Sequence, residues 1–379
     1  MQPRWIELRG TCTCVDRTLT FCFSYKEKVA CLSLLEHSAD KTVLEAIQAG
    51  DESGFAEAIE DYRRGLHLHC YRMLGSFDDA EDLVQETLLR AWRARATFQG
   101  RSLFRTWLYR IATNACLTAL ERAPRRVLPR DVAAAITAQT DASQARAEPP
   151  RAPEVPWLQP YPDSRLEPAA PREAQPEEAV VARESIELTF LAALQHLPPR
   201  QRAVLILRDV LEWSASETAS LVETSVASVN SAHQRARATL RARLGPDTPE
   251  SRVTSSEAEQ RALQAFMHAW EHADPERMTA LLREDACWAM PPAPLWFDGR
   301  AAILRLLELF PIDWHGRRFR MLSTRANRQP AAAAYLSPDG VAPYQFTGVH
   351  VLRVLDGQIA EITTFGPDLC RAFNLPPTL

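Results

Sequence analysis

The stretch that decides the fold is residues 79–93, which read DAEDLVQETLLRAWR. Its acidic side chains fall at the start, where the positive end of a helix dipole favours carboxylates, and its arginines fall at the end, where cations are favoured. Leucine, valine and alanine recur at helical spacing along one side. Ser76 or Asp78 is placed to cap the first turn. These features predict a surface helix, and they do not by themselves say what its charged face binds.

A second apolar stretch follows at residues 102–114, which read SLFRTWLYRIATN. Some of its aromatic side chains must be buried, because a helix this apolar needs a core-facing side. Arginines between aromatic residues also suit single-stranded DNA, since cations pair with phosphates and ring faces stack on unpaired bases. The stretch therefore leaves a core helix and a nucleic-acid surface both open.

Together, the two stretches resemble the conserved second region of bacterial sigma factors of the extracytoplasmic-function class, in the sigma-70 family. The resemblance runs through residues 79–87 and 104–115. In that family, the first segment binds the clamp helices of the largest RNA polymerase subunit, and the loop and second segment melt and read the minus-ten promoter element. The resemblance implies polymerase contacts by Asp82, Gln85, Glu86 and Arg90. It implies that Phe98 and Asn114 hold a flipped-out base. Arg101, Arg105 and Arg110 are the arginines interleaved with the aromatic residues, and they are the candidate contacts to the phosphates of a single strand.

Residues 197–244 form another helical block. LPPRQR at 197–202 places prolines in the first turn of a helix, where a missing amide hydrogen costs nothing. Ser214 and Glu217 match a capping box, and a third helix is predicted over 226–244, with arginines and no acidic residue. The spacing is that of a helix-turn-helix, and the arginine helix is a local footprint for DNA. A three-helix bundle with a solvated basic face is the alternative.

This block resembles the fourth region of the same sigma factors, which reads the minus-thirty-five element. The resemblance implies that Asn230, Ser231, Gln234 and Arg235 face the major groove, and Arg237 adds charge on the same helix. Asparagine and glutamine suit adenine, and arginine suits guanine or phosphate. The segment ASVNSA at 227–232 departs from the GTVRSR of many family members, which leaves the sequence preference open.

The last part of the chain changes from helices to strands. Residues 344–354 read as a strand, Asp356-Gly357 as a tight turn, and residues 359–365 as a returning strand. The order resembles the SnoaL-like domain, a cone-shaped α+β barrel of the nuclear-transport-factor-two superfamily. Side chains that could line a pocket in such a barrel are Trp288, Trp296, Tyr344, Phe346 and His350. Burial as barrel core is the alternative, and His350 has no evident carboxylate partner for catalysis.

Proline is dense over residues 123–177, which predicts a linker. Within it, WLQPYP at 157–162 is apolar enough to dock on a neighbouring domain through Trp157 and Tyr161.

Composition sets the remaining limits. A chain of 379 residues with 46% hydrophobic content can bury more than one core, and a net charge of −4 means that any DNA-binding charge is local. No run approaches the roughly 18 apolar residues of a membrane span, and no signal peptide is evident, so a cytoplasmic protein without membrane contact is predicted. Four of the eight cysteines lie in the first 31 residues at spacings that match no common zinc site, so no metal or cofactor is expected.

The predicted fold class is multidomain: two all-α helical domains, the second a helix-turn-helix, and a C-terminal α+β cone-shaped barrel of SnoaL-like type. The predicted parts are an irregular extension (1–40), a region 2 domain (41–122), a proline-rich linker (123–177), a region 4 domain (178–244) and a SnoaL-like domain (257–377).

The predicted function is a sigma factor without catalysis of its own, controlled by its C-terminal domain. Its expected partners are the RNA polymerase core, at the clamp helices and flap, and promoter DNA, both duplex and melted. Two alternatives stay open: a SnoaL-like isomerase or cyclase fused to a DNA-targeting module, and a helix-turn-helix repressor. Whether a separate anti-sigma factor binds also stays open.

Overall fold

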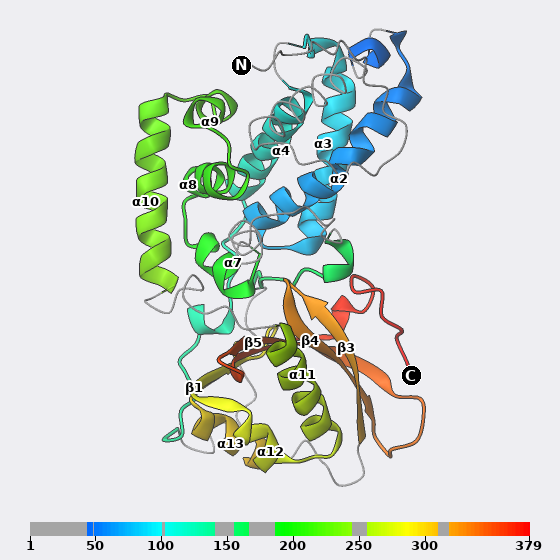
Figure 1. Ribbon diagram of the computed structural model, residues 1–379, viewed down its shortest axis with the longest axis vertical. Coiled ribbons are helices and arrows are strands. Elements are labelled where there is room, and N and C mark those ends of the chain that lie inside the picture. The colour runs from blue at the N-terminus through cyan, green and yellow to red at the C-terminus, as the bar shows by residue number, and fades with distance from the viewer. Residues whose placement is uncertain are drawn as a thin grey trace, which may run out of the picture.

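The computed structural model describes residues 44–47, 49–100, 103–140, 155–166, 186–244, 256–309 and 318–379. Two groups of helices lie side by side, and a sheet with its own helices lies below them in Figure 1. The predicted fold class, helical units followed by an α+β unit, is confirmed. The extension predicted for residues 1–40 lies outside the described residues. None of the described helices combines the length and the apolar character needed to cross a bilayer.

The first helical group surrounds one buried cluster. It contains α2 (Glu52–Leu74), α3 (Phe77–Ala94) and α4 (Phe104–Leu120). α2 begins after Asp51, whose carboxylate accepts two amide hydrogen bonds, and it ends at Gly75, where a φ of 70° reverses the chain. Ser76 then caps α3 by accepting from the amide of Asp79 at 3.1 Å, as the sequence predicts. Side chains at the centre of the cluster are Phe55, Leu66, Met73, Val84, Phe104 and Leu108.

The second helical group has the predicted helix-turn-helix. It contains α7 (Leu188–Gln195), α8 (Pro199–Leu205), a π-helical turn (Ile206–Val210), α9 (Ala215–Leu221) and α10 (Val226–Leu244). The capping box at the start of α9 is confirmed, because the Glu217 amide donates to Ser214 Oγ at 3.1 Å and the Ser214 amide donates to Glu217 Oε2 at 2.8 Å.

The third unit is a curved sheet with three helices. Its elements are α11 (Ser256–Glu271), α12 (Pro275–Ala280), β1 (Leu282–Ala289), β2 (Trp296–Asp298), α13 (Arg300–Leu309), β3 (Arg318–Ala326), β4 (Gln329–Ser337), β5 (Gln345–Leu355) and β6 (Gln358–Phe365). The strand order is β2-β1-β6-β5-β4-β3, with β1 and β6 parallel and the other neighbours antiparallel. The turn at Asp356-Gly357 has positive φ at both residues, as expected for a tight hairpin.

The two faces of this sheet belong to different cores. The inner face packs with α11, α12 and α13, through Phe266, Trp270, Trp288, Ile303, Leu352 and Ile362. The outer face joins the core of the helical groups, through Ala331, Ala333, Tyr335, Val349, Val351 and Phe365. Successive strand residues point to opposite faces, so one strand such as β4 serves both cores. The third unit is therefore built into the same core as the helices.

Gly348 marks a break in the strand alternation. A register shift lies between Ala334 and Tyr335, where β4 pairs with β5, and Gly348 has a φ of 154°. A Cβ atom at this position would lie 2.1 Å from the carbonyl oxygen of Phe365, so only glycine fits. The bulge changes which side chains of β5 face inward.

The described parts of the predicted linker, residues 123–140 and 155–166, pack against all three units. We call residues 155–166 the linker plug and residues 133–138 the linker strand. In the plug, Leu158 and Tyr161 are each 1% exposed, which confirms docking of this segment and of Tyr161 in particular. Trp157 is only half-buried, and its main chain makes the contacts, bridging to Val127.

Candidate polymerase and promoter interfaces

The solvent-facing side of α3 carries the residues predicted to bind polymerase. Asp82, Gln85 and Arg90 are exposed and Glu86 is half-buried, with Glu86 Oε1 accepting from Arg90 Nε at 2.7 Å. Leu89 lies among them and is 52% exposed. A large apolar side chain ringed by charged ones is typical of a protein-binding surface. The charge pattern of the sequence did not predict a role for Leu89. Helical spacing, which places Leu89 on the charged side of α3, could have indicated it.

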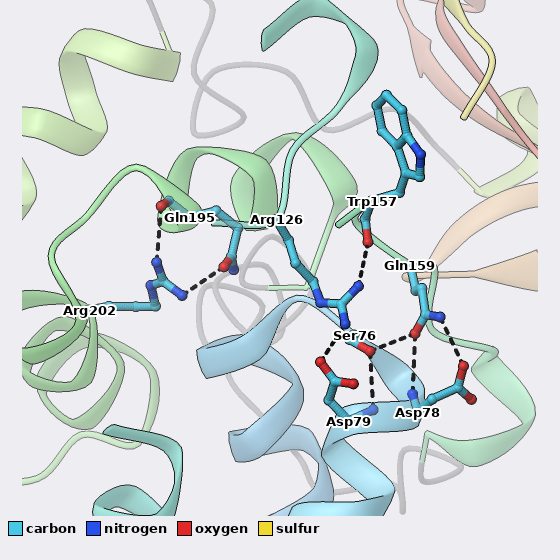
Figure 2. Close-up of polar contacts among 8 residues, drawn as sticks. All are labelled: Ser76, Asp78, Asp79, Arg126, Trp157, Gln159, Gln195 and Arg202. Atoms are coloured by element: carbon cyan, nitrogen blue, oxygen red, sulfur yellow. Dashed lines mark hydrogen bonds and ion pairs between the residues drawn. The ribbon is translucent and has the colours of Figure 1, made fainter. Parts of the chain in front are cut away.

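The start of α3 is fastened to the linker plug. Gln159 Oε1 accepts from Ser76 Oγ at 2.8 Å and from the Asp78 amide at 3.2 Å, and Gln159 Nε2 donates to Asp78 Oδ2 at 2.9 Å. Arg126 pairs with the carboxylate of Asp79 and donates to the Trp157 carbonyl (Figure 2). The linker thus satisfies the polar groups at the helix terminus nearest the predicted polymerase surface.

The helix predicted to open DNA, α4, has one free face and one packed face. Arg110 and Asn114 are exposed, one turn apart. The Arg105 guanidinium lies 5.6 Å from the ring centre of Tyr109 and 6.0 Å from that of Trp213, a cation–π arrangement that joins the two helical groups.

The predicted base-holding loop is less accessible than expected. Phe98 is 4% exposed, with its ring centre 5.3 Å from that of Phe104 and 5.5 Å from that of Trp107. In this arrangement Phe98 is part of the aromatic core, because its ring has apolar partners on several sides. Contact with a base would require it to leave this cluster. Arg101 lies outside the described residues.

The residues predicted to read duplex DNA lie together on the exposed side of α10. These exposed side chains are Asn230, Ser231, Gln234, Arg235 and Arg237. Asp209, in the π-helical turn, contacts the middle of α10, with Oδ1 2.6 Å from His233 Nε2 and Oδ2 3.6 Å from Arg237 Nε. Arg237 is therefore partly neutralised, while Arg235 is left to face solvent.

Two buried side chains hold the helical groups against each other. Arg202 of α8 donates to the Met73 carbonyl at the end of α2. It also donates to Gln195 Oε1 at 2.7 Å (Figure 2). Burial lowers the pKa of Arg202 to about 10, so the guanidinium remains charged at neutral pH. Trp213 packs on Tyr109 with 5.6 Å between ring centres.

The turn between β3 and β4 reaches into the junction of all these parts. Asn327 has a φ of 57° and is fully buried. Its Nδ2 donates to Tyr71 Oη at 2.8 Å and to the Ile186 carbonyl at 2.7 Å, and its Oδ1 accepts from the Tyr161 amide at 2.7 Å. One side chain thus joins the first helical group, the linker plug and the entry to the second helical group. Nothing in the local sequence marks it, because its partners are distant along the chain.

The five residues predicted to line a pocket lie in three different surroundings. Trp288 and His350 are in the inner core, and each places a ring nitrogen 2.8 Å from Thr364 Oγ1. Burial lowers the pKa of His350 to about 4. Tyr344 and Phe346 belong to the outer core, and half-buried Trp296 lies at the edge strand β2. The structure does not bring the five together, because the bulge at Gly348 puts Phe346 and His350 on opposite faces.

Comparison with known proteins places this arrangement in a family. Family models match three parts of the chain: Sigma-70 region 2 over residues 58–126, Sigma-70, region 4 over residues 187–240, and a SnoaL-like domain over residues 263–362. Over 335 residues the chain is 43% identical to the ECF RNA polymerase sigma factor SigG of Mycobacterium tuberculosis (strain ATCC 25618 / H37Rv), which covers 86% of this chain and 85% of SigG. The chain belongs to the extracytoplasmic-function sigma factors.

Other similar proteins cover different shares of the chain. SigW of Bacillus subtilis (strain 168) is 30% identical over 205 residues, which is 96% of SigW but 54% of this sigma factor. The crystal structure of the Mycobacterium tuberculosis sigma factor SigJ covers 85% of this chain and 100% of that one, with 21% identity and a TM-score of 0.53, so the two share a fold. The predicted function is confirmed at the level of the family: this sigma factor is a transcription initiation factor that works with RNA polymerase at promoter DNA.

Proposed function

We propose that this sigma factor binds core polymerase through the exposed side of α3, opens the minus-ten element with α4 and reads the minus-thirty-five element with α10. We further propose that the SnoaL-like unit holds the two helical groups in a closed arrangement. Residues 41–122, 123–177, 178–244 and 257–377 would serve as the polymerase-binding, linker, duplex-reading and regulatory parts. The observation that carries the proposal is Asn327, whose side chain is bonded to the first helical group, the linker plug and Ile186.

The exposed residues support the assignment of the surfaces. Asp82, Gln85 and Arg90 on α3, Asn114 on α4 and Arg235 on α10 all face solvent. The two proposed interfaces differ in charge, as their partners require. The start of α3 is acidic, which suits a protein partner, whereas α10 has arginines and no acidic residue, which suits phosphates and base edges.

The distance between promoter elements supports the need for opening. Elements centred near positions −10 and −35 are about 25 base pairs apart, or on the order of 80 Å of duplex at 3.4 Å per base pair. In the closed arrangement, the ring centre of Tyr109 on α4 lies 5.6 Å from that of Trp213 in the second helical group. One such compact unit cannot lie on both elements, so the groups must separate.

Further contacts tie the second helical group to the sheet. The Leu188 amide at the start of α7 donates to Gln329 Oε1 at 3.1 Å, and Thr189 Oγ1 donates to Glu361 Oε2 at 3.1 Å. Separation of α7 from the sheet breaks both bonds. The C-terminal unit can therefore act as a built-in inhibitor, and the SnoaL-like fold serves here as a binding body.

The polymerase assignment is tested by charge reversal. The double variant Asp82→Arg with Glu86→Arg should lose co-purification with core polymerase, because the acidic face becomes basic. Glu57→Arg is the control for charge reversal elsewhere, since Glu57 is also an exposed acidic residue but lies on α2. Circular dichroism checks that both proteins keep their helices, and run-off transcription reports initiation. Undiminished binding by the folded double variant would remove α3 from the polymerase interface.

A further inference from the structure

The edge strand β2 carries a second chain segment that the transcription function does not explain. Within the linker strand, residues 133–138, Ile136 forms a single parallel bridge to Phe297 of β2, which is the edge strand of the sheet. The Ile136 amide donates to the Trp296 carbonyl at 3.0 Å, and the Asp298 amide donates to the Ile136 carbonyl at 2.9 Å. This is the pairing by which a sheet edge binds an extended peptide.

Two side chains of the sheet unit complete the contact, and both act on backbone atoms. Trp296 Nε1 donates to the Ala133 carbonyl at 3.0 Å, and Arg305 Nη1 donates to the Ala138 carbonyl at 2.6 Å. The linker strand thus supplies only main-chain groups to these four hydrogen bonds. Recognition of this kind depends on an extended conformation and depends little on side-chain identity.

One side chain of the linker strand adds selectivity. Ile136 packs against the inner core, opposite Phe297 of β2. Its neighbours in the segment are mostly alanines, whose small side chains allow close approach of the main chain to the edge. The arrangement therefore fits a peptide with one branched apolar residue between small residues.

We propose that the edge of β2 is a peptide-binding site, which the linker strand occupies in the closed chain and which an extended peptide of that pattern can occupy in its place. An unpaired sheet edge offers free amides and carbonyls to other chains. A tethered segment competes at an effective concentration of order millimolar, so a separate peptide binds well only when the linker strand has been displaced. A peptide partner would thereby hold the linker strand away from the sheet.

The binding experiment uses the full chain and a fluorescent peptide of residues 131–140, read by anisotropy. The Ile136→Asp chain should bind this peptide at least tenfold more tightly than the unsubstituted chain, because its own linker strand no longer fits. A peptide methylated on the Ile136 nitrogen cannot donate to Trp296 and should bind at least tenfold more weakly. Methylation on the Ala135 nitrogen is the matched control, since within the described residues that amide donates no hydrogen bond.

Variants on the sheet side keep the test independent of the linker. Combined with Ile136→Asp, Trp296→Phe retains the ring but loses the indole donor, and Arg305→Ala loses the bond to Ala138; each should weaken peptide binding severalfold. Ile136→Ala replaces Ile136→Asp if the latter lowers the melting temperature. Equal binding of the two methylated peptides, or no gain in affinity from the folded Ile136 variant, would overturn the site. Because no polymerase is present, such a failure leaves the proposed promoter function untouched.

Discussion

Replacement of Asn327 by glycine is the sharpest test of the closed arrangement. Asn327 sits in the β3–β4 turn with a φ of 57°, a conformation that glycine adopts without strain. The substitution therefore leaves the turn in place and removes only the side chain. It deletes the three hydrogen bonds to Tyr71 Oη, the Ile186 carbonyl and the Tyr161 amide, all in a region where Asn327 has no exposed surface.

The expected magnitude follows from the number of bonds. Each buried hydrogen bond contributes about 1 kcal/mol net, and a partner left without a bond costs at least as much again if water cannot reach it. Three bonds therefore give a loss of about 3 kcal/mol for the closed arrangement. At 1.36 kcal/mol per tenfold, the open-to-closed ratio should rise on the order of a hundredfold.

Hydrogen exchange followed by mass spectrometry measures this ratio at the linker plug. In Asn327→Gly, peptides covering residues 155–166 should exchange on the order of a hundredfold faster, and run-off transcription should increase. Arg328→Gly is the matched control, because Arg328 has a φ of 58° in the same turn and uses its main chain to contact Asp163 and Arg325. Equal exchange in the two variants, or slow exchange in Asn327→Gly, would refute the reasoning.

Two further predictions concern DNA and pH. Asn114→Ala should reduce permanganate reactivity of promoter thymines more than it reduces closed-complex binding, whereas Arg235→Ala should weaken duplex binding by about 1–3 kcal/mol; equal effects in both assays would contradict the division. Burial lowers the pKa of His350 to about 4, below its ordinary 6.5, so stability is lost as pH falls from about 6.5 towards 4, where the unfolded chain binds the proton first. Urea unfolding should show that the free energy of unfolding falls between pH 7 and pH 4.5, and that this fall is smaller in His350→Gln by about 2–3 kcal/mol. The same fall in both proteins would exclude this histidine as its source.

The parts of the fold that depend on neighbouring residues could be predicted from the sequence. The Ser76 cap, the Ser214–Glu217 capping box and the turn at Asp356-Gly357 each involve residues within a few positions of one another, and each is confirmed. The exposure of Arg235 also follows from helical spacing. Local chemistry was sufficient in these cases because the partner groups are close in the chain.

Contacts between distant segments could not be predicted in this way. Asn327 and Tyr71 are bonded across 256 positions, and neither residue carries a local pattern that marks the pairing. Phe98 appears as a loop residue in the sequence, yet the surrounding aromatic rings bury it. The predicted docking of the linker is confirmed for Tyr161, whose ring is buried. It is only partly met by Trp157, whose side chain is half-buried. The bulge at Gly348 reverses the inward side of β5, which strict alternation cannot anticipate.

The covalent link between the SnoaL-like unit and the helices changes what the interface has to achieve. A separate inhibitor would have to offset an association cost of about 4–15 kcal/mol for lost translation and rotation. A tethered unit avoids most of that cost, so a small set of bonds, such as those of Asn327, Gln329 and Glu361, can favour the closed arrangement. Because the set is small, the free energy of polymerase and promoter binding is sufficient to break these bonds. The proposed inhibitory unit can thus keep the chain closed before polymerase binds and still be displaced afterwards. The β3–β4 turn, which contacts both helical groups, is the place where this displacement would act.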